Sequence, residues 1–308
     1  MTPTGDSDFA GPIMAAAVDV AKAVSARVMF VYASAVEDLE ALRSSIPQNT
    51  RLVLVCRDAQ DEKRAQQLSI DGMLVPAFDL TRMGQIKMAT LLAFSKHILK
   101  AGDVFVFLSG VIGRGVDTIV TMRVGDEYEL FQSVGQPKLT EHIRRPVFEK
   151  VLRLSLELAH EGREGKPVGA LFVIGDYKEV QKYCVEGRIN PFKGYTERER
   201  NILDDSMDET VKEIAKLDGA FIIKGTGVIM SACAILRPAL AGEKLPQGLG
   251  ARHAAAAAIT ANTRSLAMTL SESTGDVRVW RLGTMITEIE RSQRTPLVGG
   301  PPSASPGT

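Results

Sequence analysis

The sequence predicts an α/β protein made of two parts, each built around its own sheet. In the first half, short runs of consecutive apolar residues alternate with segments of helical spacing, and such runs are typical of parallel strands buried on both faces. In the second half, two apolar runs flank a tight turn and predict a hairpin, which adds antiparallel pairing. We therefore expect an amino-terminal three-layer domain with a mostly parallel sheet, followed by a carboxy-terminal α/β domain with a mixed sheet. The 308 residues suffice for two domains of ordinary size.

The amino-terminal part is expected to alternate between helices and strands. Helices are predicted at 11–26, 36–44, 61–68 and 83–99, and strands at 27–32, 51–56, 72–75, 103–108 and 118–124. The glycine-rich stretch 110–115 follows a strand, as a dinucleotide-binding loop would. A strand rather than a helix comes after it, so a glycine-rich β-turn is the better interpretation.

The carboxy-terminal part begins after a long amphipathic helix predicted at 140–160, whose apolar residues lie on one face. Thr196 followed by Glu199 is a capping-box pattern and predicts the start of a helix that runs to 216. The other expected elements are helices at 177–184 and 251–261, and strands at 168–174, 218–223, 228–236, 264–270 and 277–282.

These elements divide the chain into four expected segments. The first domain spans 1–135, a linking helix lies within 136–166, and the second domain spans 167–291. The tail at 292–308 is rich in Pro, Gly and Ser and is expected to be disordered.

Composition excludes several classes of function. The chain has 37 basic and 37 acidic residues, so there is no net charge to attract nucleic acid or an anionic membrane, and neither is expected as a partner. The three cysteines, Cys56, Cys184 and Cys233, form no close pair and are expected to be reduced, as in a cytoplasmic protein. We find neither a signal-peptide pattern nor an apolar stretch long enough to span a membrane.

Two short stretches carry residue types suited to nucleotide chemistry. Asp218 stands at the entrance of a predicted strand, where a carboxylate can hold a metal or steer a hydroxyl group. The glycine-rich stretch 248–250 leads into a predicted helix that starts with Arg252 and His253, and the N–H groups of a helix start bind phosphates. An aspartate that caps a turn and a solvated helix cap are the plain alternatives.

These stretches also resemble a known family. The Asp-Gly-Ala motif at 218–220 and the Arg-His-x-x-Ala motif at 252–256 resemble the paired signature of the diadenylate cyclase domain, whose members make cyclic di-AMP from two ATP. The turn at 271–275 resembles the family's Ser-Glu-Glu-Thr-Gly turn. The stretches 169–176 and 190–195 resemble the archaeal-type branch, whose amino-terminal half is similar to the carboxy-terminal domain of pyruvate kinase.

The resemblance implies an enzyme, a nucleotidyltransferase that condenses two ATP with release of two pyrophosphates. It implies that Asp218 binds a divalent metal, Mn²⁺ or Mg²⁺, and orients the 3′-hydroxyl. Gly219 would let the ribose approach the backbone, and the small side chain of Ala220 would leave room for it there. Arg252 and His253 would contact the phosphates.

The same resemblance implies further contacts to ATP. Leu236 would pack on the adenine, and Ser271 would contact a phosphate. Gly250 and Ala251 would offer backbone N–H groups at the helix start. Glu272 would share the metal with Asp218.

Three positions depart from the family's pattern. Ala251 stands where a Thr is frequent, Ala254 where an Arg is frequent, and Ser273 replaces the second Glu of the turn. These changes leave open a second interpretation, a catalytically silent module that binds adenine nucleotides, and a third, a structural interaction protein. Because the product is two-fold symmetric, the enzymatic interpretation also implies that two cyclase domains face each other in a homo-oligomer.

Overall fold

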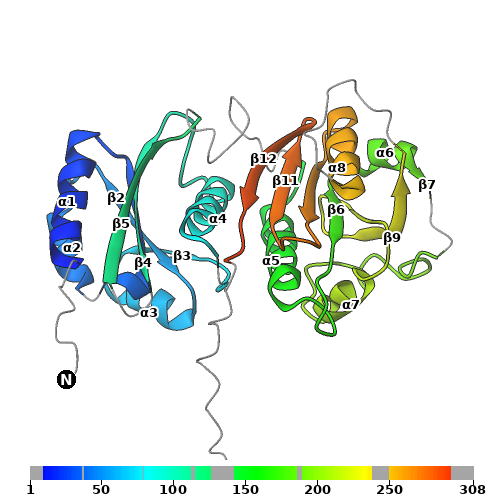
Figure 1. Ribbon diagram of the computed structural model, residues 1–308, viewed down its shortest axis with the longest axis horizontal. Helices are drawn as coiled ribbons and strands as arrows, with labels where there is room; N and C mark the ends of the chain where they lie inside the picture. Colours follow the sequence, from blue (N-terminus) through cyan, green and yellow to red (C-terminus); the bar gives the residue numbers. More distant parts are fainter. Residues whose placement is uncertain are drawn as a thin grey trace, which may run out of the picture.

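The computed structural model describes residues 10–36, 38–78, 80–111, 115–125, 142–185, 189–237 and 250–292. Within these ranges it confirms the predicted α/β fold class. A five-stranded sheet from the amino-terminal part and a seven-stranded sheet from the carboxy-terminal part lie side by side (Figure 1). The beginning of the predicted linking helix and all but the first residue of the predicted tail lie outside the described residues.

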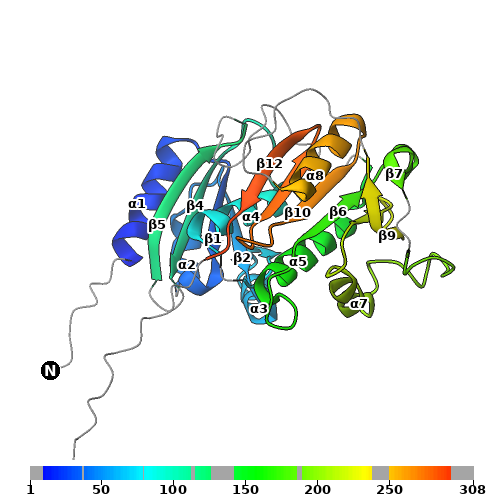
Figure 2. The ribbon, with the colours of Figure 1, turned by 45° about the vertical axis from the view of Figure 1, so that its right-hand side comes forward.

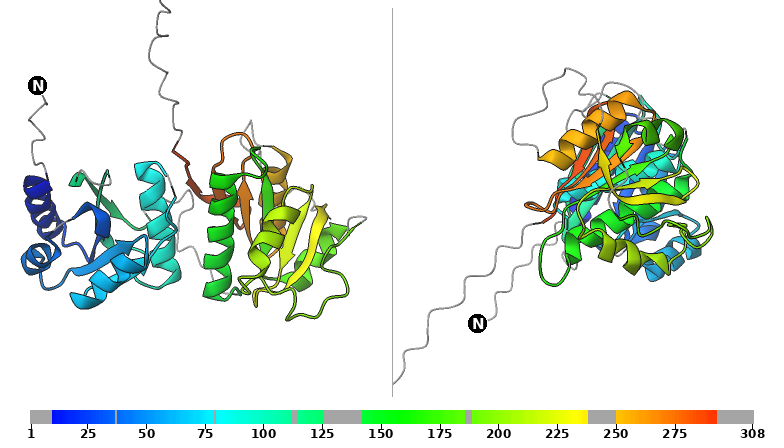
Figure 3. Two further views of the ribbon diagram at one scale, coloured as in Figure 1. Left: turned by 90° about the horizontal axis from the view of Figure 1, so that it is seen from below. Right: turned by 90° about the vertical axis from the view of Figure 1, so that its right-hand side faces the viewer.

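The amino-terminal sheet has the strand order β3-β2-β1-β4-β5. Only the edge strand β5 runs antiparallel to its neighbour, so the sheet is mostly parallel, as predicted. Helix α1 lies on one side of the strands and α4 on the other, which gives three layers (Figure 3). The elements are α1 (Ala10–Ala23), β1 (Val28–Tyr32), η1 (Ala33–Ala35), α2 (Leu39–Ser45), β2 (Arg51–Cys56), α3 (Ala59–Gln67), β3 (Asp71–Leu74), α4 (Arg82–Ser95), β4 (Val104–Val111) and β5 (Gly115–Arg123).

The carboxy-terminal sheet has the strand order β12-β11-β10-β6-β8-β9-β7. It is mixed, as predicted, because β6 and β8 are parallel whereas the other neighbours pair antiparallel. The elements are α5 (Arg145–Glu161), β6 (Ala170–Ile174), α6 (Tyr177–Val180), η2 (Gln181–Tyr183), β7 (Cys184–Val185), α7 (Met207–Ile214), β8 (Ala220–Ile223), β9 (Ile229–Leu236), α8 (Ala251–Asn262), β10 (Leu266–Leu270), β11 (Val277–Arg281) and β12 (Thr284–Ile289).

Helices α5 and α8 cover opposite faces of this second sheet. Successive side chains of a strand point to opposite faces, and β6 follows this rule. Phe172 belongs to the same apolar cluster as Val151 of α5, whereas its neighbour Leu171 belongs to a second cluster with Ala256 of α8. Helix α8 therefore covers the face of the sheet to which Leu171 points, and its small alanine side chains let it pack closely there.

The predicted helix at 196–216 is wrong over its first half. Glu199 Oε2 does accept the capping-box hydrogen bond from the Thr196 backbone N–H, at 2.9 Å, but the Thr196 hydroxyl donates to the same carboxylate oxygen, at 2.7 Å, and only turns follow. The side chains of Asn201 and Asp204 each accept a hydrogen bond from the backbone N–H two residues on. Such local bonds compete with helical ones, so the helix is confined to α7.

Two smaller differences concern strands. The expected helix at 177–184 ends after η2, and its last residue enters the short edge strand β7. Strand β12 was not predicted. Leu282 and Gly283 both have positive φ, 52° and 82°, which is typical of a two-residue turn that closes a hairpin, and the chain returns as β12.

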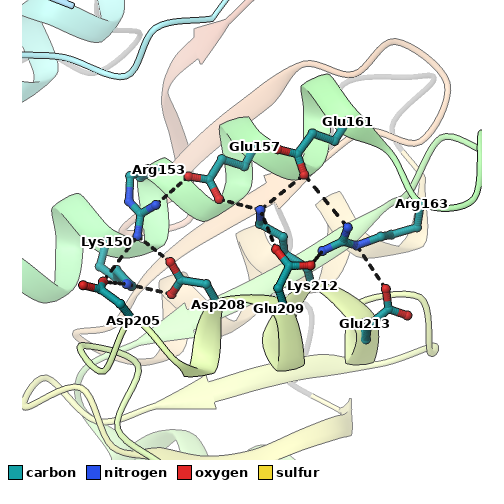
Figure 4. Close-up of polar contacts among 10 residues, drawn as sticks. All are labelled: Lys150, Arg153, Glu157, Glu161, Arg163, Asp205, Asp208, Glu209, Lys212 and Glu213. Carbon is teal, nitrogen blue, oxygen red and sulfur yellow. Dashed lines mark hydrogen bonds and ion pairs between the residues drawn. The ribbon is translucent and has the colours of Figure 1, made fainter. Parts of the chain in front are cut away.

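An ion-pair ladder between α5 and α7 fixes the segment that leads into β8 (Figure 4). Lys150 and Lys212 are nearly buried, at 7% and 6% exposure of their side chains, and each is surrounded by carboxylates. Lys212 Nζ lies 2.8 Å from Glu157, 3.2 Å from Glu161 and 3.2 Å from Glu209. The ladder as a whole comprises Lys150, Arg153, Glu157, Glu161, Arg163, Asp205, Asp208, Glu209, Lys212 and Glu213.

Helix α4 connects the two sheets, since it packs on β12 as well as on its own strands (Figure 2). Lys87 of α4 forms an ion pair with Glu290, directly after β12. Gly84 is required at this contact because a Cβ there would lie 2.6 Å from the Glu290 carbonyl oxygen. Over the part of the chain that the structure describes, no helix has the length and apolarity needed to cross a membrane.

Candidate functional site

A cavity of about 500 Å³ lies where the start of β8, the end of β9 and the start of α8 meet. Its size is typical of small-molecule sites, which span roughly 300–1,000 Å³. Among the described lining residues, Asp218 and Arg252 are charged and the others are mainly apolar. The lining residues are Leu171, Ile189, Leu217, Asp218, Gly219, Ala220, Cys233, Ala234, Ile235, Leu236, Ala251, Arg252 and Ala255.

Gly219 fits a position that no other residue could occupy without strain. Its φ is +114°, and a Cβ would lie 2.5 Å from the carbonyl carbon of Cys233 on β9. The two strands are irregular here, with register shifts in the β8–β9 pairing and a positive φ of 56° at Cys233. The backbone at Gly219 therefore borders the cavity directly, and Asp218 is left with an almost fully exposed side chain.

Arg252 joins three parts of the predicted site. Its Nη2 lies 3.7 Å from Asp218 Oδ1, and its Nη1 lies 3.3 Å from Glu272 Oε2. The guanidinium packs against the backbone of Gly169, where a Cβ would collide with it. Residues from the starts of β6, β8 and α8 and from the turn after β10 thus converge on one point, which includes Asp218, Arg252 and Glu272 of the predicted site residues.

His253 is placed differently from Arg252. Its imidazole is not part of the cavity wall. It is buried, with 7% of the residue exposed, and its Nε2 lies 2.7 Å from Nη1 of Arg278 on β11. Burial, followed by the positive charges of Arg278 and Arg252, lowers the pKa of His253 from 6.5 to about 4. The histidine is therefore neutral at pH 7 and adds no positive charge to the site.

The remaining predicted residues divide into two groups. Leu236, Ala220 and Ala251 line the cavity. Ser271 does not line it, because its hydroxyl lies within the turn, 3.2 Å from Ser273 Oγ and 3.3 Å from the Thr274 backbone nitrogen. Gly250 precedes α8, and no side chain of the described residues caps the first N–H groups of the helix, which suits them to bind a ligand.

The sequence analysis missed most of the apolar wall. Leu171, Ala234 and Ala255 form its floor, and the exposed side chains of Leu217 and Ile235 stand at its rim. No pattern in the sequence distinguishes these residues from ordinary core residues. The spacing of Ala251 and Ala255 along one face of α8 is the one available signal, because small side chains at four-residue spacing leave room for a ligand.

An apolar cavity of this size next to an open helix start suits a purine base and its phosphates, because the base packs on the wall while the N–H groups and Arg252 meet the phosphates. The fold and the site thus define a nucleotide-binding α/β protein.

Comparisons with known proteins agree with this class. Residues 157–285 match the family described as "DisA bacterial checkpoint controller nucleotide-binding", and residues 12–131 match the family described as "Probable sensor domain DacZ_P". A diadenylate cyclase of Haloferax volcanii is 37% identical over 203 residues, which cover 64% of this chain and 72% of that protein. A diadenylate cyclase of Methanocaldococcus jannaschii is 36% identical over 182 residues, which cover 57% of this chain and 55% of that protein.

Among solved structures, the chain is similar to DacA from Staphylococcus aureus, with 23% identity, a TM-score of 0.30, and coverage of 45% of this chain and 83% of that one. The chain belongs to the diadenylate cyclase family, and it is an enzyme of the nucleotidyltransferase class. The likeness of its amino-terminal half to pyruvate kinase stays a prediction.

The donor chemistry of the site is compatible with a divalent metal. Asp218 and Glu272 present two solvent-open carboxylates beside the same guanidinium. Mg²⁺ is commonly held by one or two carboxylates together with water and substrate phosphates, so a dedicated cage of protein ligands is not required. Consistent with this, the described residues contain no cluster of three or more metal-binding side chains.

Proposed function

We propose that this protein condenses two ATP molecules into cyclic di-AMP and releases two pyrophosphates. The observation that supports this most directly is the convergence of Asp218 and Glu272 on Arg252, with Asp218 and Arg252 in the wall of one apolar cavity. The three residues come from separate parts of the chain, and a merely structural role would not require all three to meet beside an open cavity.

In the proposed reaction, the adenine packs on the apolar wall formed by Leu171 and Leu236. Arg252 and the open N–H groups of α8 bind the phosphates and withdraw charge from them. Asp218 orients the 3′-hydroxyl and accepts its proton as the oxygen bonds to the α-phosphorus of the other ATP. The bond from that phosphorus to pyrophosphate breaks in line.

The proposal includes a divalent metal, Mn²⁺ or Mg²⁺, held by Asp218 and Glu272. When bound, it would neutralise negative charge on the triphosphate. Arg252 lies between the two carboxylates and would exchange part of its contact with them for contact with the phosphates.

The reaction needs two copies of the site, because each ATP supplies a hydroxyl to the other. We infer that two chains face each other through the open side of the cavity. Leu217 and Ile235 support this arrangement, since both are large apolar side chains about half exposed at the rim, where a second copy would cover them.

We also propose that the protein has two domains, at 1–135 and 167–291, joined by the segment 136–166. The helix of that segment, α5, packs on the second sheet, on β6, β10 and β11. This division agrees with the two family matches at 12–131 and 157–285.

The test is incubation with ATP and Mn²⁺, followed by mass spectrometry of the products. We expect cyclic di-AMP, and we expect Asp218→Asn to lower its rate of formation by about 100-fold or more, the usual contribution of a general base. Asp19→Asn is the matched control, because Asp19 is an exposed aspartate of α1 that pairs only loosely with Lys22, at 3.9 Å. A variant Asp218→Asn as active as the wild type would contradict the role given to Asp218.

A mixture of wild-type and Asp218→Asn chains tests the facing arrangement. In a mixed pair one hydroxyl keeps its carboxylate and the other loses it, so the linear, singly joined dinucleotide should accumulate. If no linear product forms at any mixing ratio, the two active sites do not act on each other's ATP.

A further inference from the structure

His253 is held by a pair of residues that neither the motifs nor the cavity includes. Arg278 of β11 directs Nη1 at His253 Nε2, at 2.7 Å. Glu288 of β12 holds the same guanidinium from the other side, with its Oε1 2.7 Å from Nε and 2.6 Å from Nη2. The Arg278 side chain is only 15% exposed, so water competes weakly for these bonds.

This contact fixes which nitrogen of His253 carries the proton. A guanidinium has donors and no acceptor, so Nε2 must be the acceptor of the 2.7 Å hydrogen bond. A neutral imidazole that accepts at Nε2 carries its hydrogen on Nδ1. The same geometry also opposes protonation of the ring, because a hydrogen on Nε2 would point at a cation.

The Nδ1–H group has no partner within the described residues, although it is buried. A buried donor without an acceptor destabilises the folded chain. The position of Nδ1 indicates where its acceptor would bind. A Cβ placed on Gly250 would lie 4.0 Å from Nδ1, so the donor faces the start of α8, where the open backbone N–H groups also lie.

We propose that Arg278, clamped by Glu288, is a positioning residue that holds His253 as a neutral Nδ1–H donor directed at the start of α8, where the phosphates of ATP would bind. The assignment of the acceptor as a phosphate rests on the proposed function. The assignment of the tautomer rests on the contact between Arg278 and His253 alone. The charge on the phosphates is then met by Arg252, while His253 supplies a directed neutral hydrogen bond.

Nitrogen-15 NMR of the full-length protein tests the tautomer without any turnover. The chain has four histidines, so the His253 signals can be assigned by comparison with His253→Ala. We expect Nδ1 to be protonated and Nε2 to be a hydrogen-bond acceptor at pH 7. In Arg278→Met, which lacks the donor, the proton should distribute between both nitrogens, whereas Arg278→Lys should preserve most of the wild-type pattern.

Two further variants separate a specific effect on His253 from misfolding and from a general effect of losing an arginine. Glu288→Gln keeps an acceptor for the guanidinium and should shift the His253 nitrogen signals less than Arg278→Met does. If Arg278→Met does not fold, the shift in Glu288→Gln tests the tautomer in its place. Arg51→Met is the matched control, because Arg51 bridges two neighbouring strands to Asp71 at 2.6 Å in the other sheet. It should leave the His253 spectrum and the activity unchanged.

Turnover then tests the role. Arg278→Met should lower the rate of cyclic di-AMP formation by about 10–100-fold, the usual effect of removing a residue that orients a functional side chain. In a His253→Ala background the same substitution should cause no further loss, because it acts through His253. An equal loss in both backgrounds, or a wild-type spectrum with the proton on Nε2, overturns the proposal. A wild type that shows the predicted tautomer but forms no product would instead refute the proposed function.

Discussion

Gly219→Ala is the substitution whose effect can be worked out most completely from the structure. The added Cβ would lie 2.5 Å from the carbonyl carbon of Cys233, 2.6 Å from its Cα and 2.9 Å from its carbonyl oxygen. All three atoms belong to the backbone of β9, which cannot move aside as a flexible side chain can. The residue would also have to keep a φ of +114°, which L-residues rarely adopt.

Two contributions add to the predicted loss of stability. A backbone conformation unsuited to alanine costs about 1–3 kcal/mol, and overpacking against a fixed neighbour costs about 1–3 kcal/mol more. The sum is about 2–6 kcal/mol. For a chain of this size the melting temperature should fall by roughly 5–20 °C. Urea unfolding followed by circular dichroism measures the free energy of unfolding, and differential scanning fluorimetry measures the melting temperature.

Gly194→Ala is the matched control for the steric part. Gly194 has a φ of +92°, but no atom lies within 4 Å of the position that its Cβ would take. It should lose only the conformational contribution, about 1–3 kcal/mol. If Gly219→Ala is no less stable than Gly194→Ala, the close approach between Gly219 and Cys233 does not constrain the site, and the reasoning fails.

Three more predictions concern His253, Lys212 and Leu236. Because the pKa of His253 is lowered from 6.5 to about 4 in the folded chain, only the unfolded chain binds this proton between these two pH values. The free energy of unfolding should therefore decrease by up to about 3 kcal/mol as the pH falls from 6.5 to 4. Urea unfolding measured against pH should show a smaller decrease in His253→Gln. Lys212→Met removes the nearly buried cation that Glu157, Glu161 and Glu209 share, and leaves them only Arg153 and Arg163 as partners. It should lower the free energy of unfolding by about 2–3 kcal/mol, measured in urea. Leu236→Ala shortens the cavity wall and should raise the KM for ATP about tenfold with little change in kcat, measured by steady-state kinetics.

The amino-terminal fold could be predicted in detail because its signals are local. The continuous apolar runs at 27–32 and 51–56 lie in β1 and β2, since strands buried on both faces leave no polar positions. The helix at 196–216 could not be predicted as it is. A capping-box pattern identifies hydrogen bonds that do form at Thr196, but it does not say whether the next residues continue a helix or bond to their own side chains.

The sequence by itself determined the fold class, the order of most elements and the residue types of the site. It predicted that Asp218 lies at the start of a strand and Arg252 at the start of a helix. These positions can be read from short stretches, because charge type, glycine content and apolar periodicity are local properties of the chain. Only the tertiary structure decided that Arg252 meets Asp218 and Glu272, whereas His253 turns to Arg278. The physical reason is that strand order and helix placement, which depend on burial summed over the whole chain, determine which side chains face one another.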